Sequence, residues 1–254
     1  MRFASLGSGS EGNGLVVEAD GTRVLVDCGF GVRDTAARLR RLGLAPDDLD
    51  AILVTHEHSD HVGGVPAFAA RHGIAVWATF GTLTAVAGRF EGMARVYGFD
   101  SHERFAIGAL EIVPIAVPHD AREPAQFVIG DGARRVGILT DLGIPTPHVE
   151  ACLSGCEALV LECNHDLAML EQGSYPWPLK QRIASRLGHL DNETAAALLA
   201  RLDTSRLVHV VAAHLSRENN TRELARAALA GALGCAEAWI GIATQDDGFD
   251  WRDI

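Results

Sequence analysis

The segment His56-Glu57-His58-Ser59-Asp60-His61 constrains the possible folds of this chain more than any other feature. It directly follows the apolar run 51–55, which is typical of a buried strand. Histidines two residues apart in an extended chain point to the same side, so His56 and His58 can hold one metal ion. Asp60 and His61 follow where the chain turns toward a helix, and they can face a second ion.

Three more coordinating side chains come after apolar runs. His119 follows the run 112–117, Asp141 follows 136–140, and His214 follows 208–213. Strand ends aim such side chains into a shared cleft. Imidazole and carboxylate ligands without cysteine suit zinc, manganese or iron. We therefore expect two divalent metal ions per chain, held by the seven residues His56, His58, Asp60, His61, His119, Asp141 and His214.

Length and composition are those of a globular enzyme. The 254 residues are 48% hydrophobic and 22% charged, and we expect one domain over residues 1–254. No apolar run approaches the ~20 residues of a transmembrane helix, and Gly7 interrupts any signal-peptide core, so we expect a cytoplasmic protein without a membrane segment. Five cysteines without a CxxC motif are expected to be reduced thiols.

The hydrophobic pattern predicts two groups of strands, each followed by helices. Apolar or alternating runs predict strands at 14–19, 23–27, 51–55, 74–78, 105–107, 110–117, 126–129, 135–140, 158–162 and 207–213. Helical patterns cover 34–42, a segment from Val65, 192–202 and 217–229. This arrangement indicates two sheets packed face to face with helices outside.

The order of the coordinating residues resembles that of the metallo-β-lactamase superfamily. The resemblance implies an α/β (α+β) fold, the αββα sandwich of two mixed sheets, with metals at one edge of the sheets. It also implies a division of the ligands: His56, His58 and His119 on one ion, Asp60, His61 and His214 on the other. Asp141 would bridge the two ions.

Further motifs resemble the YycJ/WalJ branch of that superfamily over nearly the whole chain. They are the segments 5–13, 26–29, 118–121, 161–166, 175–176, 188–190 and 214–220. This similarity implies a cytoplasmic metal-dependent 5′-to-3′ exonuclease whose substrate is the end of double-stranded DNA. A metal-activated hydroxide would attack phosphorus, with Asp60 orienting it. Asp191 departs from the pattern, where serine is expected.

Several residues outside the ligand set are candidates for catalysis or support. His189 resembles the extra histidine of ribonuclease Z enzymes and can protonate a leaving group. Asp27, at a strand end, can accept the second ring N–H of a ligand histidine, and Asp120 can do the same. The glycine-rich loop with Ser8 and Asn13 can approach a phosphate. The residues assigned either to the substrate groove or to capping are His165, Asn219 and Asn220.

Other functions stay open at this level. The same ligands would serve an acyl hydrolase such as a thioesterase, a lactonase or a glyoxalase II-like enzyme, and the net charge of −11 favours it mildly. A non-catalytic binding module is a third reading, against which the intact ligand set argues. Basic residues near the motifs favour a nuclease: Lys180, Arg182, Arg186, Arg217 and Arg222.

Overall fold

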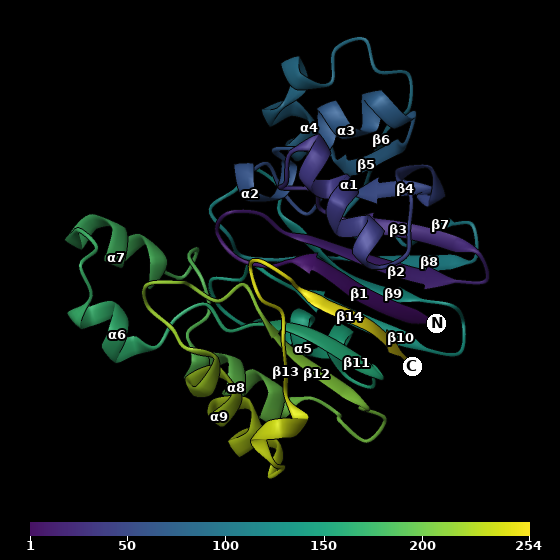
Figure 1. Ribbon diagram of the computed structural model, residues 1–254. Coiled ribbons are helices and arrows are strands. Elements are labelled where there is room, and N and C mark those ends of the chain that lie inside the picture. Colours follow the sequence, from purple (N-terminus) through teal and green to yellow (C-terminus); the bar gives the residue numbers. More distant parts are fainter.

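Two seven-stranded sheets form the centre of the molecule (Figure 1). The computed structural model describes residues 1–254. The first sheet contains, in spatial order, β14 (Phe249–Asp253), β1 (Arg2–Gly7), β2 (Gly14–Ala19), β3 (Thr22–Val26), β4 (Ala51–Leu53), β5 (Ala75–Thr79) and β6 (Val96–Phe99). The second contains β13 (Gly241–Ile242), β12 (His209–Ala213), β11 (Ala158–Glu162), β10 (Arg135–Leu139), β9 (Ala125–Gly130), β8 (Leu110–Ala116) and β7 (Phe105–Ile107).

Helices cover the outer face of each sheet, which confirms the αββα sandwich. The first sheet carries α1 (Val32–Arg41), α2 (Ser59–Val62), α3 (Val65–His72) and α4 (Phe80–Ala85); the second carries α5 (Pro147–Leu153), α8 (Asn192–Arg201) and α9 (Arg222–Leu233). Short 3-10 turns lie at Pro46–Asp48, Ala87–Arg89 and Glu237–Trp239. None of the helices combines the length and apolar character needed to cross a bilayer.

The alternation of side chains along the strands explains the three hydrophobic layers. In β3, Val24 and Val26 belong to the core between the sheets, while Leu25 belongs to the core beneath the helices of the first sheet. Side chains of successive strand residues point to opposite faces, so both faces are apolar and both are covered. Phe3 and Phe127 enter the central core from opposite sheets, and burial stabilises each by roughly 1.5–3 kcal/mol.

The sheet topology brings several strand ends to one edge. β3 and β4 are parallel in the first sheet. In the second sheet β10, β11 and β12 are parallel, and β8 runs in the same direction because both β8 and β10 are antiparallel to β9. Within each sheet the carboxyl ends of these strands therefore lie at the same edge, and the side chains that follow β4 and β8 come together between the two sheets. The segments that follow them carry the candidate ligands.

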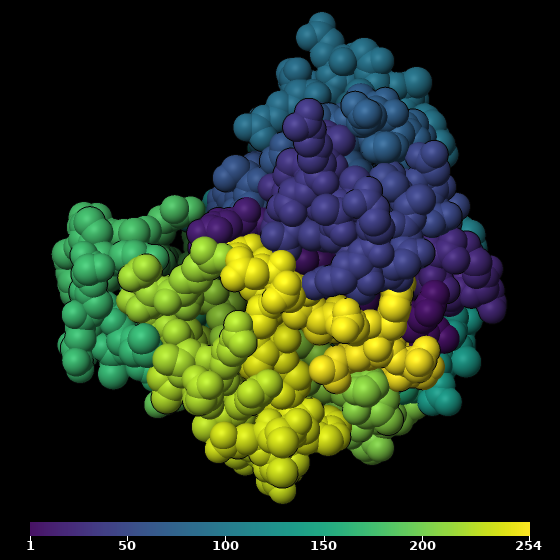
Figure 2. Space-filling model, in the orientation of Figure 1, coloured from purple at the N-terminus to yellow at the C-terminus, as the bar shows by residue number.

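A helical hairpin that the sequence pattern did not indicate projects beside this edge. It consists of α6 (Leu167–Gln172) and α7 (Trp177–Ile183), and Figure 2 shows this green segment standing out from the body of the molecule. The Lys180 ammonium donates to the carbonyl oxygens of Glu171 and Gly173, at 2.7 Å each, and so joins the two helices.

Most of the predicted elements are confirmed, with differences at some boundaries and several omissions. The helix predicted over 217–229 was wrong at its start, because the Thr221 side chain accepts from the Leu224 N–H and caps α9 at Arg222. The edge strands β14, β6 and β13, the inner strand β1 and the short helices α4 and α5 were not predicted. Short elements at sheet edges carry too few periodic positions for a pattern to detect.

All five cysteines are free thiols, as the sequence predicted. Cys28, Cys156 and Cys163 are buried, whereas Cys152 and Cys235 are partly exposed. Burial raises the pKa of Cys156 to about 11 and that of Cys28 to about 12. These thiols are therefore protonated at neutral pH and behave as small apolar side chains.

Candidate metal centre

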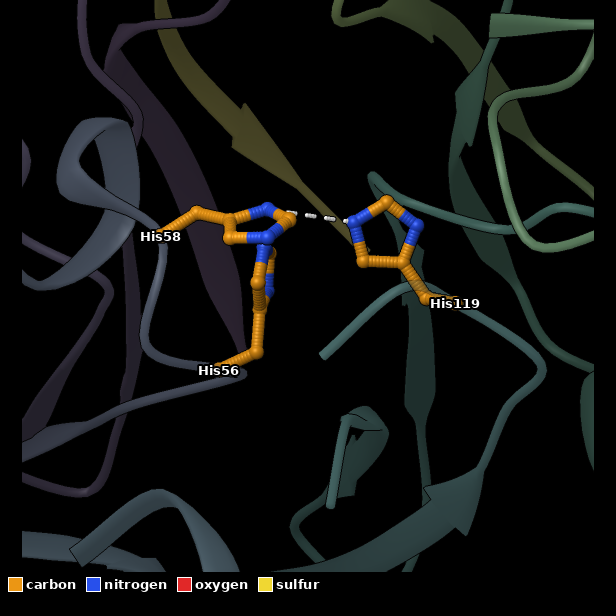
Figure 3. A group of neighbouring side chains, drawn as sticks. All are labelled: His56, His58 and His119. Atoms are coloured by element: carbon orange, nitrogen blue, oxygen red, sulfur yellow. Dashed lines mark hydrogen bonds between the residues drawn. The ribbon is translucent and has the colours of Figure 1, made fainter. Parts of the chain in front are cut away.

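Three histidines converge from the ends of β4 and β8 (Figure 3). His56 and His58 lie on the loop that leaves β4, and His119 faces them from the loop after β8. The His58 Nδ1 atom lies 3.3 Å from the His119 Nε2 atom. The Nε2 atom of His56 is buried and has no hydrogen-bond partner. One ligand atom from each ring lies within 4.8 Å of the others, so all three can reach one ion.

A second group contains Asp60, His61 and His214. Asp60 Oδ2 lies 3.2 Å from His61 Nε2 and 3.5 Å from His214 Nε2. Asp60 and His61 belong to α2, the short helix that opens directly after His58. His214 follows β12 and has φ of +54°, so the chain turns sharply there to direct its ring to the cluster.

Asp141 lies between the two groups. Its Oδ2 atom is 3.1 Å from His61 Nε2, and its Oδ1 atom is 3.8 Å from His119 Nε2. The side chain is 1% exposed, and Oδ2 accepts no hydrogen bond. The Asp141 carboxylate could therefore coordinate an ion in either group.

The residues present fit divalent metal ions. Ligand atoms about 2.1 Å from a tetrahedral ion lie about 3.4 Å apart, and the separations of 3.1–3.5 Å found here match that value. Buried polar atoms without partners are rare in proteins, and His56 Nε2 and Asp141 Oδ2 are two of them. A metal ion would satisfy both atoms.

The charges of the cluster also favour a cation. Burial lowers the pKa of His119 to about 4 and the pKa of His56 well below its usual value, so both rings are neutral and offer lone pairs. Burial would also lower the pKa of His61, but Asp141 and Asp60 outweigh burial and raise it well above the usual range. Buried carboxylates thus require a positive charge beside them, which a metal ion supplies.

The cluster forms one wall of an open polar cleft of about 360 Å³. The lining residues include four of the candidate ligands together with serine, asparagine and arginine side chains. They are Ser10, His58, Ser59, Asp60, Asp141, Asn164, Tyr175, Arg182, His189, His214 and Ser216. A substrate in this cleft would contact the metal cluster and hydrogen-bonding groups, with one aromatic side chain.

Comparison with known proteins places the chain in a family. Residues 22–210 match the β-lactamase superfamily domain. The exodeoxyribonuclease YycJ of Bacillus anthracis is 36% identical over 235 residues, which cover 92% of this chain and 89% of that protein. The exodeoxyribonuclease WalJ of Streptococcus pneumoniae is 33% identical and covers 95% and 91% of the two chains.

The chain belongs to the YycJ/WalJ family of the β-lactamase superfamily. Its fold is also that of solved superfamily structures. The metallo-β-lactamase fold protein YhfI from Bacillus subtilis superposes with a TM-score of 0.77 over 99% of each chain, at 15% identity.

In this YycJ/WalJ-family cluster, a hydrogen bond from the Nδ1 atom orients the ring of each of three candidate ligand histidines. His61 Nδ1 donates to Asp27 Oδ2 at 2.8 Å, which is the contact expected of Asp27. His214 Nδ1 donates to the Thr140 carbonyl oxygen at 2.6 Å, and His119 Nδ1 donates to the Gly188 carbonyl oxygen at 2.9 Å. Each bond fixes the proton on Nδ1 and leaves the Nε2 lone pair free for a metal.

Asp120 was expected to accept the second ring N–H of a ligand histidine, and it does not do so for His119; its Oδ1 atom lies 3.8 Å from Nε2 of His58. The outer nitrogen of His119 is bonded to Gly188, and Asp120 Oδ1 lies 3.5 Å from the inner Nε2 atom instead. The other carboxylate oxygen of Asp120 accepts from Arg182 Nε at 2.5 Å. Asp120 therefore connects the candidate metal ligands to the α6–α7 hairpin.

Ser8 and Asn13 support the ligands rather than a phosphate. The Ser8 hydroxyl accepts from the His214 N–H at 2.9 Å, and Asn13 Nδ2 lies 3.4 Å from Asp60 Oδ2. The N–H groups of Gly9 and Asn13 bond to protein oxygens. Ser8 and Asn13 are themselves buried, and these backbone donors are already used. Ser10 of the same loop lines the cleft, and the approach of this loop to a phosphate stays a prediction.

His189 reaches the cleft with its ring held by Glu162. His189 Nδ1 donates to Glu162 Oε1 at 2.7 Å, and the ring lies 5.2 Å from that of His119 between centroids. Asp191, two residues later, caps α8 by accepting from the Thr194 N–H. Capping is thus done by the aspartate that replaces the expected serine, and His189 is free of that role.

Glu162 is a site residue that the sequence reasoning missed. Its carboxylate is fully buried, and Oε2 also accepts from the N–H groups of Leu142 and Leu190, at 2.8 and 3.2 Å. It occupies the last position of β11, at the same edge as Asp141 and His214. The sequence signal that could have identified Glu162 is a charged residue at the end of an apolar strand.

The groove residues proposed from sequence need correction. His165 and Asn219 are each 1% exposed and do not line the cleft, whereas the neighbouring Asn164 does. Asn220 Nδ2 donates to the Cys163 carbonyl oxygen and to Asn192 Oδ1, so it joins the loop after β11 to the start of α8. These residues follow strand ends like the ligands do, but their side chains point into the protein.

We expect Glu162→Gln to reduce hydrolysis by about 10- to 100-fold, the usual effect of losing an outer partner of a site histidine. The amide keeps the size of the side chain but cannot accept three N–H bonds with a negative charge. Steady-state rates and metal content of the purified variant would check this. An unchanged rate would show that Glu162 does not position His189. The exposed Glu171→Gln, on α6, is the matched control.

Proposed function

We propose that the chain is a metal-dependent phosphodiesterase that acts as a 5′-to-3′ exonuclease on the ends of double-stranded DNA. The observation that supports this most is the near full-length similarity to exodeoxyribonucleases in a chain whose seven metal-ligand candidates meet beside one cleft. Two ions are proposed, one held by His56, His58 and His119, the other by Asp60, His61 and His214, with Asp141 bridging. Zinc, manganese or iron would suit these donors.

Bound divalent ions would supply Lewis-acid chemistry, activating water and polarising a phosphoryl oxygen. The protein residues then position the reacting groups. Asp60 is partly exposed at the cleft and can orient the attacking water. His189 can protonate the departing 3′-oxygen from its second ring nitrogen, because Nδ1 is held by Glu162 and the ring lines the cleft.

The composition of the cleft favours a phosphodiester over an acyl substrate. Of the eleven residues that line it, only Tyr175 is apolar. Acyl groups are usually bound by predominantly hydrophobic pockets.

The five free thiols also accord with the proposed cytoplasmic location.

The deciding experiment follows the products from a DNA duplex labelled at one known 5′ end, with Mn²⁺ or Zn²⁺ added. We expect label to be released first as short products, and a chelator to stop the reaction. Single-stranded RNA, an acyl thioester and a lactone are incubated in parallel. Hydrolysis of either ester with intact DNA would refute the proposal, and release from the unlabelled 3′ end first would refute the polarity.

A further inference from the structure

The α6–α7 hairpin contributes two chemically distinctive side chains to the cleft. Arg182, on α7, is the one arginine or lysine among the eleven lining residues, and Tyr175, just before α7, is the one aromatic ring other than histidine. The remaining lining residues are histidine, aspartate, serine and asparagine. In a chain of net charge −11, a cation at this position indicates an anionic ligand.

Most of the N–H donors of the Arg182 guanidinium have no acceptor within the protein. Its Nε atom donates to Asp120 Oδ2 at 2.5 Å, and no protein group accepts from its two terminal nitrogens. The side chain is 57% exposed. A guanidinium has five N–H donors in a planar fork that matches the oxygens of a phosphate. Four of these N–H groups therefore remain available at the cleft.

The loop that follows α7 joins the hairpin to the candidate metal ligands. The Asp120 N–H donates to the Leu187 carbonyl oxygen at 2.9 Å, and His119 Nδ1 donates to the Gly188 carbonyl oxygen at 2.9 Å. A Cβ atom at Gly188 would collide with the carbonyl oxygens of Arg182 and Ile183, so only glycine allows the chain to fold back this closely. These contacts hold Arg182 at a set position relative to the ligands.

We propose that the α6–α7 hairpin recognises one nucleotide of the DNA strand beside the metal centre, with Arg182 binding a phosphate and Tyr175 stacking on a base. The inference rests on the proposed nuclease function and adds the residues that select its substrate. Phosphate and base are the two parts of a nucleotide that a guanidinium fork and an aromatic ring bind best. Both groups come from one hairpin, whose helices Lys180 joins, so both parts would be bound together.

The hairpin also provides matched controls. Trp177 is an exposed residue of α7 that faces an apolar groove between α6 and α7. Arg186 is exposed three residues after α7, and although it is one of the basic residues near the motifs, it does not line the cleft. Arg186→Gln removes the same charge as Arg182→Gln, and Trp177→Ala removes an aromatic ring as Tyr175→Ala does. Any general effect of charge or of hairpin stability therefore appears in the controls too.

The test measures the Kd of the metal-loaded protein for a fluorescent duplex with hydrolysis-resistant phosphorothioate linkages at its ends. We expect Tyr175→Ala to weaken binding about 5- to 150-fold, the effect of losing one stacked base, and Tyr175→Phe to restore it. Arg182→Gln should weaken binding and reduce the slope of log Kd against log salt by about 1. Arg182→Lys should restore the slope but only part of the affinity, since it lacks the fork. The two controls should stay within about twofold of wild type.

The outcomes separate the two proposals. If the wild-type protein neither binds nor cleaves DNA, the nuclease function fails, and this inference with it. If the wild-type protein cleaves DNA but Arg182→Gln and Tyr175→Ala bind as tightly as wild type, the nuclease stands and the hairpin assignment is overturned. Equal losses in all four variants would overturn it as well, since they would indicate a general polyanion surface. Thermal unfolding of each variant excludes misfolding as the cause of a loss.

Discussion

Asp141→Ala is expected to abolish DNA hydrolysis and to lower the metal content of the purified protein, while the chain stays folded. Asp141 is the carboxylate that lies between the two ligand groups, 3.1 Å from His61 Nε2 and 3.8 Å from His119 Nε2. Its removal takes a ligand candidate from both sides at once. The loss of metal affinity should therefore exceed the 10- to 100-fold that removal of an outer partner causes.

Metals per chain, counted by elemental analysis, and circular dichroism together measure this outcome. Asp250→Ala serves as the control. Asp250 is an exposed residue of the edge strand β14 and does not belong to any group of candidate ligands. It should keep the wild-type metal content and rate. Full occupancy with normal turnover in Asp141→Ala would remove Asp141 from the proposed centre.

His189→Ala is expected to retain both metals and most of the stability but to lose DNA hydrolysis by about 10²–10⁴-fold. The ring lines the cleft and receives its orientation from the buried Glu162 carboxylate. Without it, the departing oxygen lacks a positioned proton donor. An acyl ester, which has no charged ground state, should depend on this residue far less. Single-turnover rates on duplex DNA measure the loss.

Metal content decides between this role and a ligand role for His189. One ligand atom each of Asp141, Glu162, His189 and His214 lies within 4.8 Å of the others, so a ligand role is geometrically possible. A variant that loses one metal would make His189 a ligand, and a wild-type rate on DNA would exclude any catalytic role. His148→Ala, at an exposed position of α5, should change neither quantity.

The sequence by itself determined the parts of this protein that depend on local pattern. Strand and helix periods predicted two sheets with outer helices, because alternation with period two reports directly which side chains face a core. It also predicted the seven ligand candidates, since each follows an apolar strand. A coordinating residue directly after a buried strand is aimed from the end of a sheet, so His56, His119, Asp141 and His214 were expected to share one cleft.

Only the tertiary structure decided which polar side chains face the cleft and which support it. Asn164 lines the cleft and His165, its neighbour, is buried, although both follow β11. Glu162 became part of the site only through its bond to His189, 27 residues away. Arg182 reached the cluster through Asp120, 62 residues away. Such contacts depend on side-chain direction and on distances between separate loops, and no local period in a sequence encodes either.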